Sequence, residues 1–209
     1  MSGVLDAEDY AHRVDSVKRF ERQLTDNGYL VLKFFFHISQ KEQKKRINEL
    51  EENKDTAWRV SGHDKWQNKH YEKYLAVFEK YLSDTNVSGA PWYIIDAKDR
   101  KWAELQALET MCSGIEVALQ NESLAVPLLQ NVFPLEKMPK LSEIPLDKFM
   151  DETEYREELH HLQGKLNALH YRLYRKKVPV IIAYEGWDAA GKGGNIKRIA
   201  GALDPRGYE

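Results

Sequence analysis

The feature that most constrains this chain is a glycine-rich run between an apolar segment and a helical one. Residues 178–184 read VPVIIAY, and residues 185–194 read EGWDAAGKGG. Gly186 and Gly191 have four residues between them and Lys192 follows, which is the GxxxxGK spacing. A strand, a glycine-rich loop and a helix in this order are the context that a P-loop requires, so a chance match in a turn is disfavoured. The pattern predicts an α/β protein that binds phosphoryl groups.

The residue types of this loop suit that chemistry. Glycines let the backbone turn its N–H groups inward around phosphate oxygens, and the start of the next helix adds partial positive charge. Lys192 is expected to neutralise an oxygen of the transferring phosphate. A Ser or Thr commonly follows the lysine and binds magnesium, but Gly193 stands there. Asp188 is therefore the predicted Mg²⁺ ligand, because a carboxylate inside a phosphate cradle needs a cation between the two anions.

Periodicity elsewhere predicts further strands and helices. Residues 29–38 (YLVLKFFFHI) form a nearly continuous apolar run, typical of a strand covered on both faces in a parallel sheet, and residues 92–96 (WYIID) form a shorter one. Apolar spacing predicts helices over residues 7–27, 39–52, 63–82 and 100–118, along a stripe from Tyr155 to Leu173, and from the loop to about residue 203. The alternation of strands and helices favours an α/β layer over a helix bundle.

Composition excludes several classes of protein. The net charge of −2 argues against a strongly basic nucleic-acid binder, and no apolar run approaches the ~20 residues of a membrane helix. The N-terminus lacks the basic and then apolar order of a signal peptide. The single cysteine, Cys112, excludes an internal disulfide and is expected to be a buried apolar side chain. A cytoplasmic protein without nucleic-acid or membrane partners is expected.

The loop also carries a family resemblance. The segment EGWDAAGKGGNIKRIAGALDPRGYE resembles the nucleotide- and phosphate-binding segment of the polyphosphate kinase 2 family, which also places glycine after the lysine. The first half, through FERQLTDNGYLVLKFFFHIS, EQKKR and APWYIIDAKD, is similar to the C-terminal half of the same family. This order resembles the centre of a two-domain polyphosphate:AMP phosphotransferase. It implies half of a first domain at residues 1–120, a proline-rich surface linker at 121–150, and half of a second domain at 151–209.

The resemblance implies an incomplete P-loop kinase-like fold, a three-layer α/β/α arrangement with parallel strands from two half-domains. In the family the P-loop strand lies beside the strand equivalent to residues 29–38, so the three strands are expected to pair in one sheet. Otherwise the half-domains would expose apolar edges, and a homo-oligomer is a further expectation. Neither an Asp-Arg-Ser-Trp segment nor the second domain's acidic motif and basic lid is found, so an inactive fragment is also considered.

The activity implied is phosphoryl transfer between polyphosphate and AMP or ADP, with Mg²⁺ as cofactor. Asp188 and Lys192 would be catalytic, and the phosphate or nucleotide would be bound by Gly186, Ala189, Ala190, Gly191, Gly193, Gly194, Arg198 and Arg206. Two alternatives stay open, a non-catalytic phosphate-binding or assembly module and an ATP-dependent P-loop kinase of another family.

Four further matches to the family lie in the first half, at Trp58, Ser61, Asp64 and Trp92. Both tryptophans are expected to pack in the core, where buried aromatic side chains are common. The basic cluster Lys41, Lys44, Lys45 and Arg46 is interpreted as a solvated helix face in preference to a polyanion groove.

Overall fold

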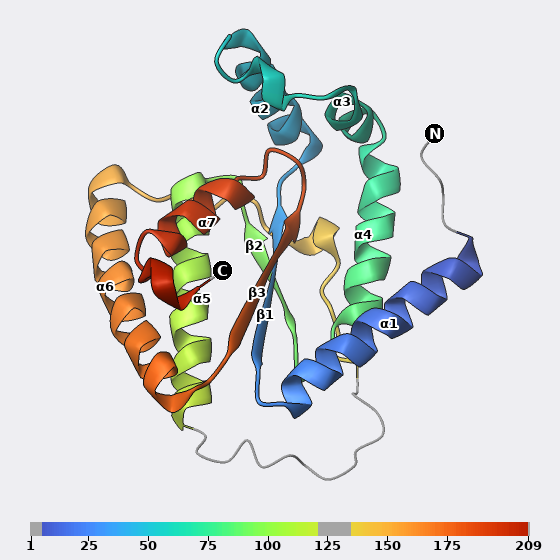
Figure 1. Cartoon of the computed structure of the whole chain (residues 1–209). Helices are drawn as coiled ribbons and strands as arrows, with labels where there is room; N and C mark the ends of the chain where they lie inside the picture. The colour runs from blue at the N-terminus through green and yellow to red at the C-terminus, as the bar shows by residue number, and fades with distance from the viewer. Residues whose placement is uncertain (1–5, 121–134, 209) are drawn as a thin grey trace.

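The computed structural model describes residues 6–120 and 135–208, and its centre is a parallel three-stranded sheet (Figure 1). The strands are β1 (Leu30–His37), β2 (Trp92–Asp96) and β3 (Val180–Gly186). β1 lies in the middle and pairs in parallel with β2 on one side and β3 on the other. The predicted α/β class with parallel strands is confirmed. So is the expectation that the P-loop strand and the strand near residues 29–38 share one sheet.

Helices cover both faces of this sheet. One face is covered by α5, α6 and α7, the other by α1 and α4, and α2 and α3 project beyond the carboxyl ends of the strands (Figure 1). The bounds are α1 (Ala7–Asp26), α2 (Gln40–Glu52), α3 (Gly62–Lys69), α4 (Tyr71–Thr85), α5 (Arg100–Gln120), α6 (Glu152–Lys176) and α7 (Lys192–Ala200). Three short 3₁₀ turns, η1 (Ala57–Arg59), η2 (Leu141–Glu143) and η3 (Pro205–Gly207), complete the described elements.

The helix predicted over residues 63–82 is two helices, so this prediction is wrong. The break is at His70, whose backbone (φ −109°, ψ 29°) leaves the helical region. The His70 ring nitrogen Nδ1 lies 2.8 Å from the Trp66 carbonyl oxygen, which fixes the turn. The break lets α3 direct Gln67 and Asn68 toward α2, while α4 directs Tyr71 toward the end of β3. A single straight helix would not provide both contacts.

The core is built around β1. Phe34, Phe35 and Phe36 are each at most 1% exposed, and the Tyr184 ring of β3 lies 5.5 Å from that of Phe34 and 5.6 Å from that of Phe36. Cys112 is buried as expected, and burial raises the pKa of its thiol to about 11. No helix among the described residues is long and apolar enough to cross a membrane.

Two outcomes in the first half and the linker differ from the sequence interpretation. Trp92 is buried as expected, but Trp58 is 77% exposed and its packing in the core was wrongly predicted. Within the predicted linker, Leu141 and Met150 are buried in the core, so this part does not simply lie over the surface. Residues 121–134 of that segment lie outside the described residues.

Candidate phosphate-binding site

The glycine-rich loop joins β3 to α7 at the carboxyl end of the sheet, which is where parallel α/β sheets bind ligands. Gly186 has φ 133°, and a Cβ atom there would lie 2.6 Å from the Phe36 backbone nitrogen, so only glycine fits. Gly191 caps α7 with φ 101°, and Ala189 also has positive φ, at 62°. These turns fold the backbone back before α7 begins, so the helix N-terminus faces the loop.

Lys192 is held over this loop. Its ammonium group donates to the carbonyl oxygens of Gly186 at 2.7 Å and Trp187 at 2.9 Å. An ammonium group has three donors, so one remains for a phosphate oxygen. Burial lowers the pKa of Lys192, although Asp188 and Glu185 oppose this shift. A partly desolvated cation of this kind is stabilised by an anion, as the sequence-based role requires.

Asp188 lies beside Asp64, the third residue of α3. Burial raises the pKa of Asp188, the nearby Asp64 carboxylate adds to this shift, and Lys192 opposes it. Burial also acts to raise the pKa of Asp64, but hydrogen bonds from the Ser61 N–H at 2.6 Å and hydroxyl at 2.8 Å outweigh it, so the net shift is downward. The family match at Ser61 and Asp64 therefore corresponds to a capping box whose carboxylate faces the loop.

The donor set suits Mg²⁺. Carboxylate oxygens are the hard ligands that Mg²⁺ prefers, and Mg²⁺ in phosphate sites keeps several waters and phosphate oxygens. Residues 6–120 and 135–208 contain no group of three or more His, Cys, Asp or Glu arranged to hold a metal ion. The residues that would hold Mg²⁺ are therefore Asp188 and Asp64, with phosphate oxygens completing the coordination of the ion.

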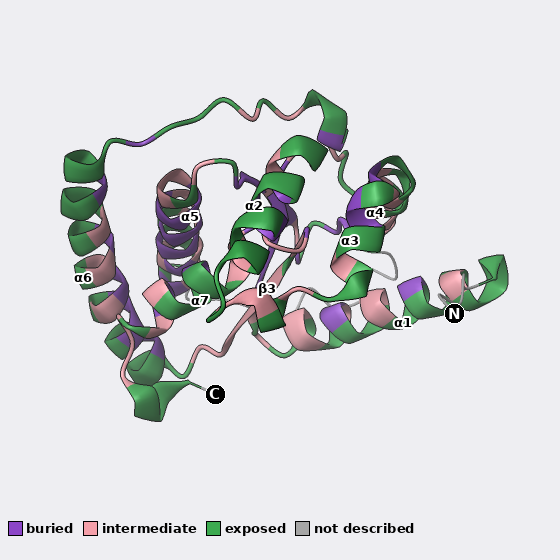
Figure 2. Cartoon of the chain, turned by 90° about the horizontal axis from the view of Figure 1, so that it is seen from above, coloured by how far each residue is buried: buried purple, intermediate pink, exposed green. Residues whose placement is uncertain are grey.

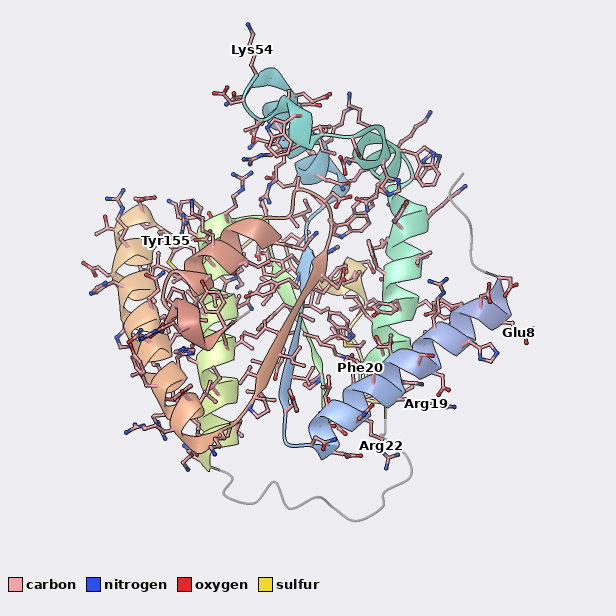
Figure 3. All side chains as sticks on the ribbon, viewed as in Figure 1. Glu8, Arg19, Phe20, Arg22, Lys54 and Tyr155 are labelled. Carbon is pink, nitrogen blue, oxygen red and sulfur yellow. The ribbon has the colours of Figure 1, made fainter. Side chains whose placement is uncertain are left out.

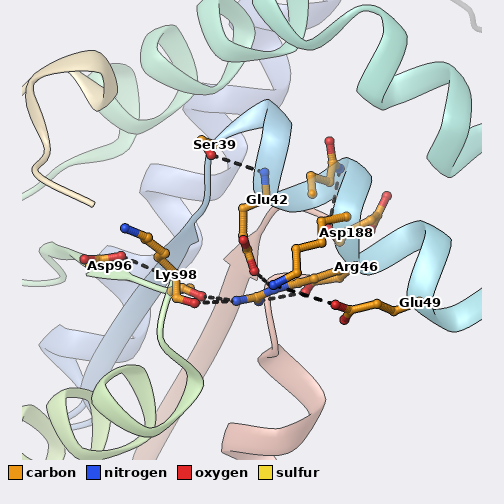
Figure 4. Close-up of polar contacts among 11 residues, drawn as sticks. Ser39, Glu42, Arg46, Glu49, Asp96, Lys98 and Asp188 are labelled. Atoms are coloured by element: carbon orange, nitrogen blue, oxygen red, sulfur yellow. Dashed lines mark hydrogen bonds and ion pairs between the residues drawn. The ribbon is translucent and has the colours of Figure 1, made fainter. Parts of the chain in front are cut away.

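The loop is held in place by Arg46 of α2 (Figure 4). The guanidinium group is buried and donates to the carbonyl oxygens of Ala189 at 3.0 Å, Ala97 at 2.8 Å and Lys98 at 2.7 Å. Its Nε lies 2.8 Å from the Glu42 carboxylate, which balances the buried charge. Arg46 thus joins α2, the segment after β2 and the loop. The prediction that Arg46 lies on a solvated helix face is wrong, because its side chain is buried.

A second anchor is Trp187, which is fully buried. Its indole N–H donates to His37 Nδ1 at 3.0 Å, and its ring stacks on Tyr71 with centroids 4.0 Å apart. The ring of Phe78 meets it edge-on at 4.9 Å. Sequence reasoning missed Trp187, His37 and Arg46 as residues that position the loop. The one available signal was a large aromatic residue inside a glycine-rich run.

The remaining predicted site residues divide into two groups. Ala190 is buried within the loop, and Gly193 and Gly194 lie in the first turn of α7, so these residues adjoin the cradle. Arg198 lies 3.3 Å from the carboxylate of Glu104 and donates to the hydroxyl of Tyr155, which points from α6 toward α5 and α7 (Figure 3).

Arg206 is paired with Asp204 at 2.7 Å and lines a hollow of about 670 Å³ between α6, β3 and η3. Neither arginine has an ion-pair or hydrogen-bond partner in the glycine-rich loop within the described residues. Their contact with phosphate stays a prediction.

Comparison with known proteins accords with this geometry. A model of the family Polyphosphate kinase 2 matches residues 1–123 and 149–209. The chain is 33% identical over 201 residues to a polyphosphate:AMP phosphotransferase of Pseudomonas aeruginosa and 34% identical over 199 residues to that of Pseudomonas syringae pv. tomato. Each match covers 93% of this chain and 40% of the relative.

A shorter match, 34% identical over 106 residues, is to an AMP/ADP-polyphosphate phosphotransferase of Meiothermus ruber and covers 49% of this chain and 40% of the relative. The chain thus spans 40% of the length of the two Pseudomonas relatives. The family model matches nearly all of the described residues in both halves, including the glycine-rich loop. The chain belongs to the polyphosphate kinase 2 family.

Proposed function

We propose that this chain supplies the phosphate-binding part of a polyphosphate-dependent nucleotide phosphotransferase, with AMP as the preferred acceptor and ADP as the alternative. The observation that carries this proposal is the loop between β3 and α7, where Lys192 has a free donor and Asp188 lies beside it. The names of the relatives, polyphosphate:AMP phosphotransferase and AMP/ADP-polyphosphate phosphotransferase, support polyphosphate as the donor and AMP or ADP as acceptors.

The proposed reaction needs no covalent intermediate on the protein. An oxygen of the AMP phosphate forms a bond to the terminal phosphorus of polyphosphate, and the bond between that phosphorus and the bridging oxygen breaks. ADP and a polyphosphate shortened by one phosphate leave. The backbone N–H groups of the loop would orient the terminal phosphate, and Lys192 would neutralise charge on its oxygens as the transition state forms.

Asp188 would hold Mg²⁺, with Asp64 as a second carboxylate in reach of the same ion. When bound, Mg²⁺ would neutralise the charge between neighbouring phosphate oxygens. Arg46 and Trp187 would keep the loop carbonyls of residues 187–189 in place while the phosphate exchanges. A cytoplasmic location, self-association and the division into two half-domains remain predictions from the sequence.

The test is ADP formation from AMP, polyphosphate and Mg²⁺ by this chain and by its Lys192→Ala variant. Loss of one oxyanion-stabilising donor reduces rates by about 100-fold or more, so the variant should lose nearly all transfer. Lys197→Ala is a matched control, because Lys197 lies exposed on the same helix. Transfer unaffected by Lys192→Ala would contradict the proposal. Polyphosphate binding that needs Lys192 without any ADP formation would instead support a non-catalytic phosphate-binding module.

A further inference from the structure

A groove of about 730 Å³ lies between α2 and α3, and four of its five charged lining residues are basic. Lys41 and Lys44 come from α2, and Lys65 and Lys69 come from α3. The α2 pair is three residues apart and the α3 pair four, so each pair lies on one face of its helix. Four ammonium groups therefore line the two walls of the same groove.

The charge of this groove is only partly balanced. Glu51 is the one carboxylate in the lining, and it is paired with Lys65 at 2.5 Å. Lys41, Lys44 and Lys69 are exposed, and within residues 6–120 and 135–208 none of them forms an ion pair. Like charges at this spacing on a helix destabilise it, so the arrangement favours an anionic occupant.

The floor of the groove is close to the glycine-rich loop. Asn68, which is 9% exposed, donates to the side-chain oxygen of Gln43 at 3.0 Å. Gln43 donates to Gln67 at 2.6 Å and reaches the carbonyl oxygen of Asp188 at 3.5 Å. One layer of buried amide side chains thus separates the groove from the loop. The helices α2 and α3 that form the groove lie, like the loop, at the end of the molecule where the carboxyl ends of the strands meet (Figure 1).

The lining also indicates which anion fits. The described groove has no aromatic side chain, so it offers no platform on which a nucleobase could stack. Lysine binds phosphate as a point charge on a flexible stem, without the fixed fork by which arginine selects one geometry. A row of lysines without aromatic residues suits a repeating chain of phosphates better than a nucleotide or a nucleic acid.

We propose that the α2–α3 groove binds a stretch of linear polyphosphate away from the transferring phosphate, so that this chain holds the polymer at two places. The proposal rests on the proposed function and adds a second subsite to it. It also replaces the interpretation of Lys41 and Lys44 as a solvated helix face. That interpretation considered α2 alone, whereas α3 adds Lys65 and Lys69 on the opposite wall.

The experiment compares two double variants of the full chain. Lys44→Gln with Lys69→Gln removes one charge from each wall of the groove. Lys45→Gln with Lys73→Gln removes the same charge from exposed positions outside the lining. Fluorescence anisotropy would measure the binding of labelled long-chain polyphosphate and of tripolyphosphate at several salt concentrations.

The groove variant should bind long-chain polyphosphate roughly tenfold more weakly than the control variant, because it loses the binding free energy of two exposed charge contacts. The slope of log affinity against log salt should fall by about two for the two lysines removed, because fewer counterions are displaced. Tripolyphosphate, which is short enough to occupy the loop alone, should bind both variants equally.

Equal affinity of the two variants for long-chain polyphosphate would overturn the proposal. So would tighter binding of a single-stranded RNA homopolymer that is lost in the groove variant, because the occupant would then be nucleic acid. Lys192→Ala separates this inference from the proposed function. If Lys192→Ala leaves the affinity for tripolyphosphate unchanged, the proposed function fails. The comparison of the groove and control variants still tests the groove in that case.

Discussion

β1 and β3 are neighbouring parallel strands with similar apolar sequences, yet they are buried to different degrees, and Figure 2 shows β3 in the colour of intermediate burial. Seven of the eight residues of β1 are buried, whereas no residue of β3 is fully buried and Glu185 is exposed. The difference follows from position, because β1 has a strand on each side and β3 has one on a single side within the described sheet. An apolar run therefore indicates a strand suited to burial, while its neighbours decide how much burial it obtains.

This difference matters for the site, because the loop begins at the end of the less buried strand. Its position depends on the more buried one. The Trp187 N–H donates to the Phe36 carbonyl oxygen at 3.2 Å, and the Trp187 side chain donates to His37. The glycine-rich loop thus follows β3, but its position is fixed by β1 and the helices that follow β1.

The largest expected effect is a direct comparison of the two strands at one register position, where Leu32 pairs with Ile182. Leu32 is 2% exposed, so Leu32→Ala should reduce the free energy of unfolding by about 3–5 kcal/mol through lost burial and a cavity. Ile182 is half-buried, and Ile182→Ala should cost only about 1–2 kcal/mol. Urea unfolding measures both, and equal losses would contradict the comparison.

A second pair of variants tests where β3 meets β1. Gly186→Ala places a methyl group against the Phe36 backbone at positive φ and should cost about 3 kcal/mol. At Gly191 the nearest atom to an added Cβ is an Arg100 side-chain carbon at 3.9 Å, so Gly191→Ala should cost about 1 kcal/mol from backbone strain alone. Urea unfolding and tripolyphosphate binding would both be measured. Similar unfolding energies would mean that the close approach to β1 is not limiting.

Much of the fold could be predicted because its signals are local. The three strands were predicted from apolar runs and lie within two residues of the expected ends. The break at His70 and the burial of Leu141 were both missed. The break rests on the backbone turn at His70 and its contact with the Trp66 carbonyl oxygen, which leave the apolar spacing of the two helices unchanged. The burial of Leu141 depends on packing against distant elements, such as the Glu79 side chain that its N–H contacts. Tertiary contacts of this kind leave no periodicity in the sequence.

The candidate site divides in the same way. The loop itself was predicted from the glycine spacing and Lys192, since those residues are consecutive. The supports of the loop were not, because Arg46 is 143 residues from Ala189 and His37 is 150 residues from Trp187. Arg46 was interpreted as one member of a charged run, and only the fold shows that it is buried while its neighbours Lys44 and Lys45 are exposed.

The burial of β1 should also make stability depend on pH through His37. Burial lowers the pKa of His37 to about 4, against an ordinary 6.5, although a hydrogen bond with the Leu141 backbone opposes the shift. Between these two pH values the unfolded chain binds a proton that the folded chain does not, so stability is retained above pH 6.5 and lost toward pH 4.

The loss of stability attributable to His37 should be about 3 kcal/mol. The measurement is urea unfolding between these pH values for the wild type and for His37→Gln, which keeps an acceptor for the Trp187 indole. The difference between the two profiles isolates this residue from the carboxylates that titrate in the same range. Parallel profiles would show that His37 is not buried in its neutral form.

The smallest expected effect concerns two tyrosines, one on each side of the comparison. The Tyr184 hydroxyl on β3 is buried and has no hydrogen-bond partner within the described residues, and burial raises its pKa. Tyr184→Phe should therefore leave the free energy of unfolding unchanged or raise it by up to about 1 kcal/mol. Tyr71 is the matched case, because its hydroxyl donates to the Ile38 carbonyl oxygen at 2.7 Å just beyond β1. Tyr71→Phe should lower the free energy of unfolding by about 1 kcal/mol. Opposite signs of the two changes in the free energy of unfolding, measured with urea, would support the comparison. A loss of stability in Tyr184→Phe would instead show that this hydroxyl has a hydrogen-bond partner. The polar groups at the edge of the sheet along β3 would then be better satisfied than the position of β3 indicates.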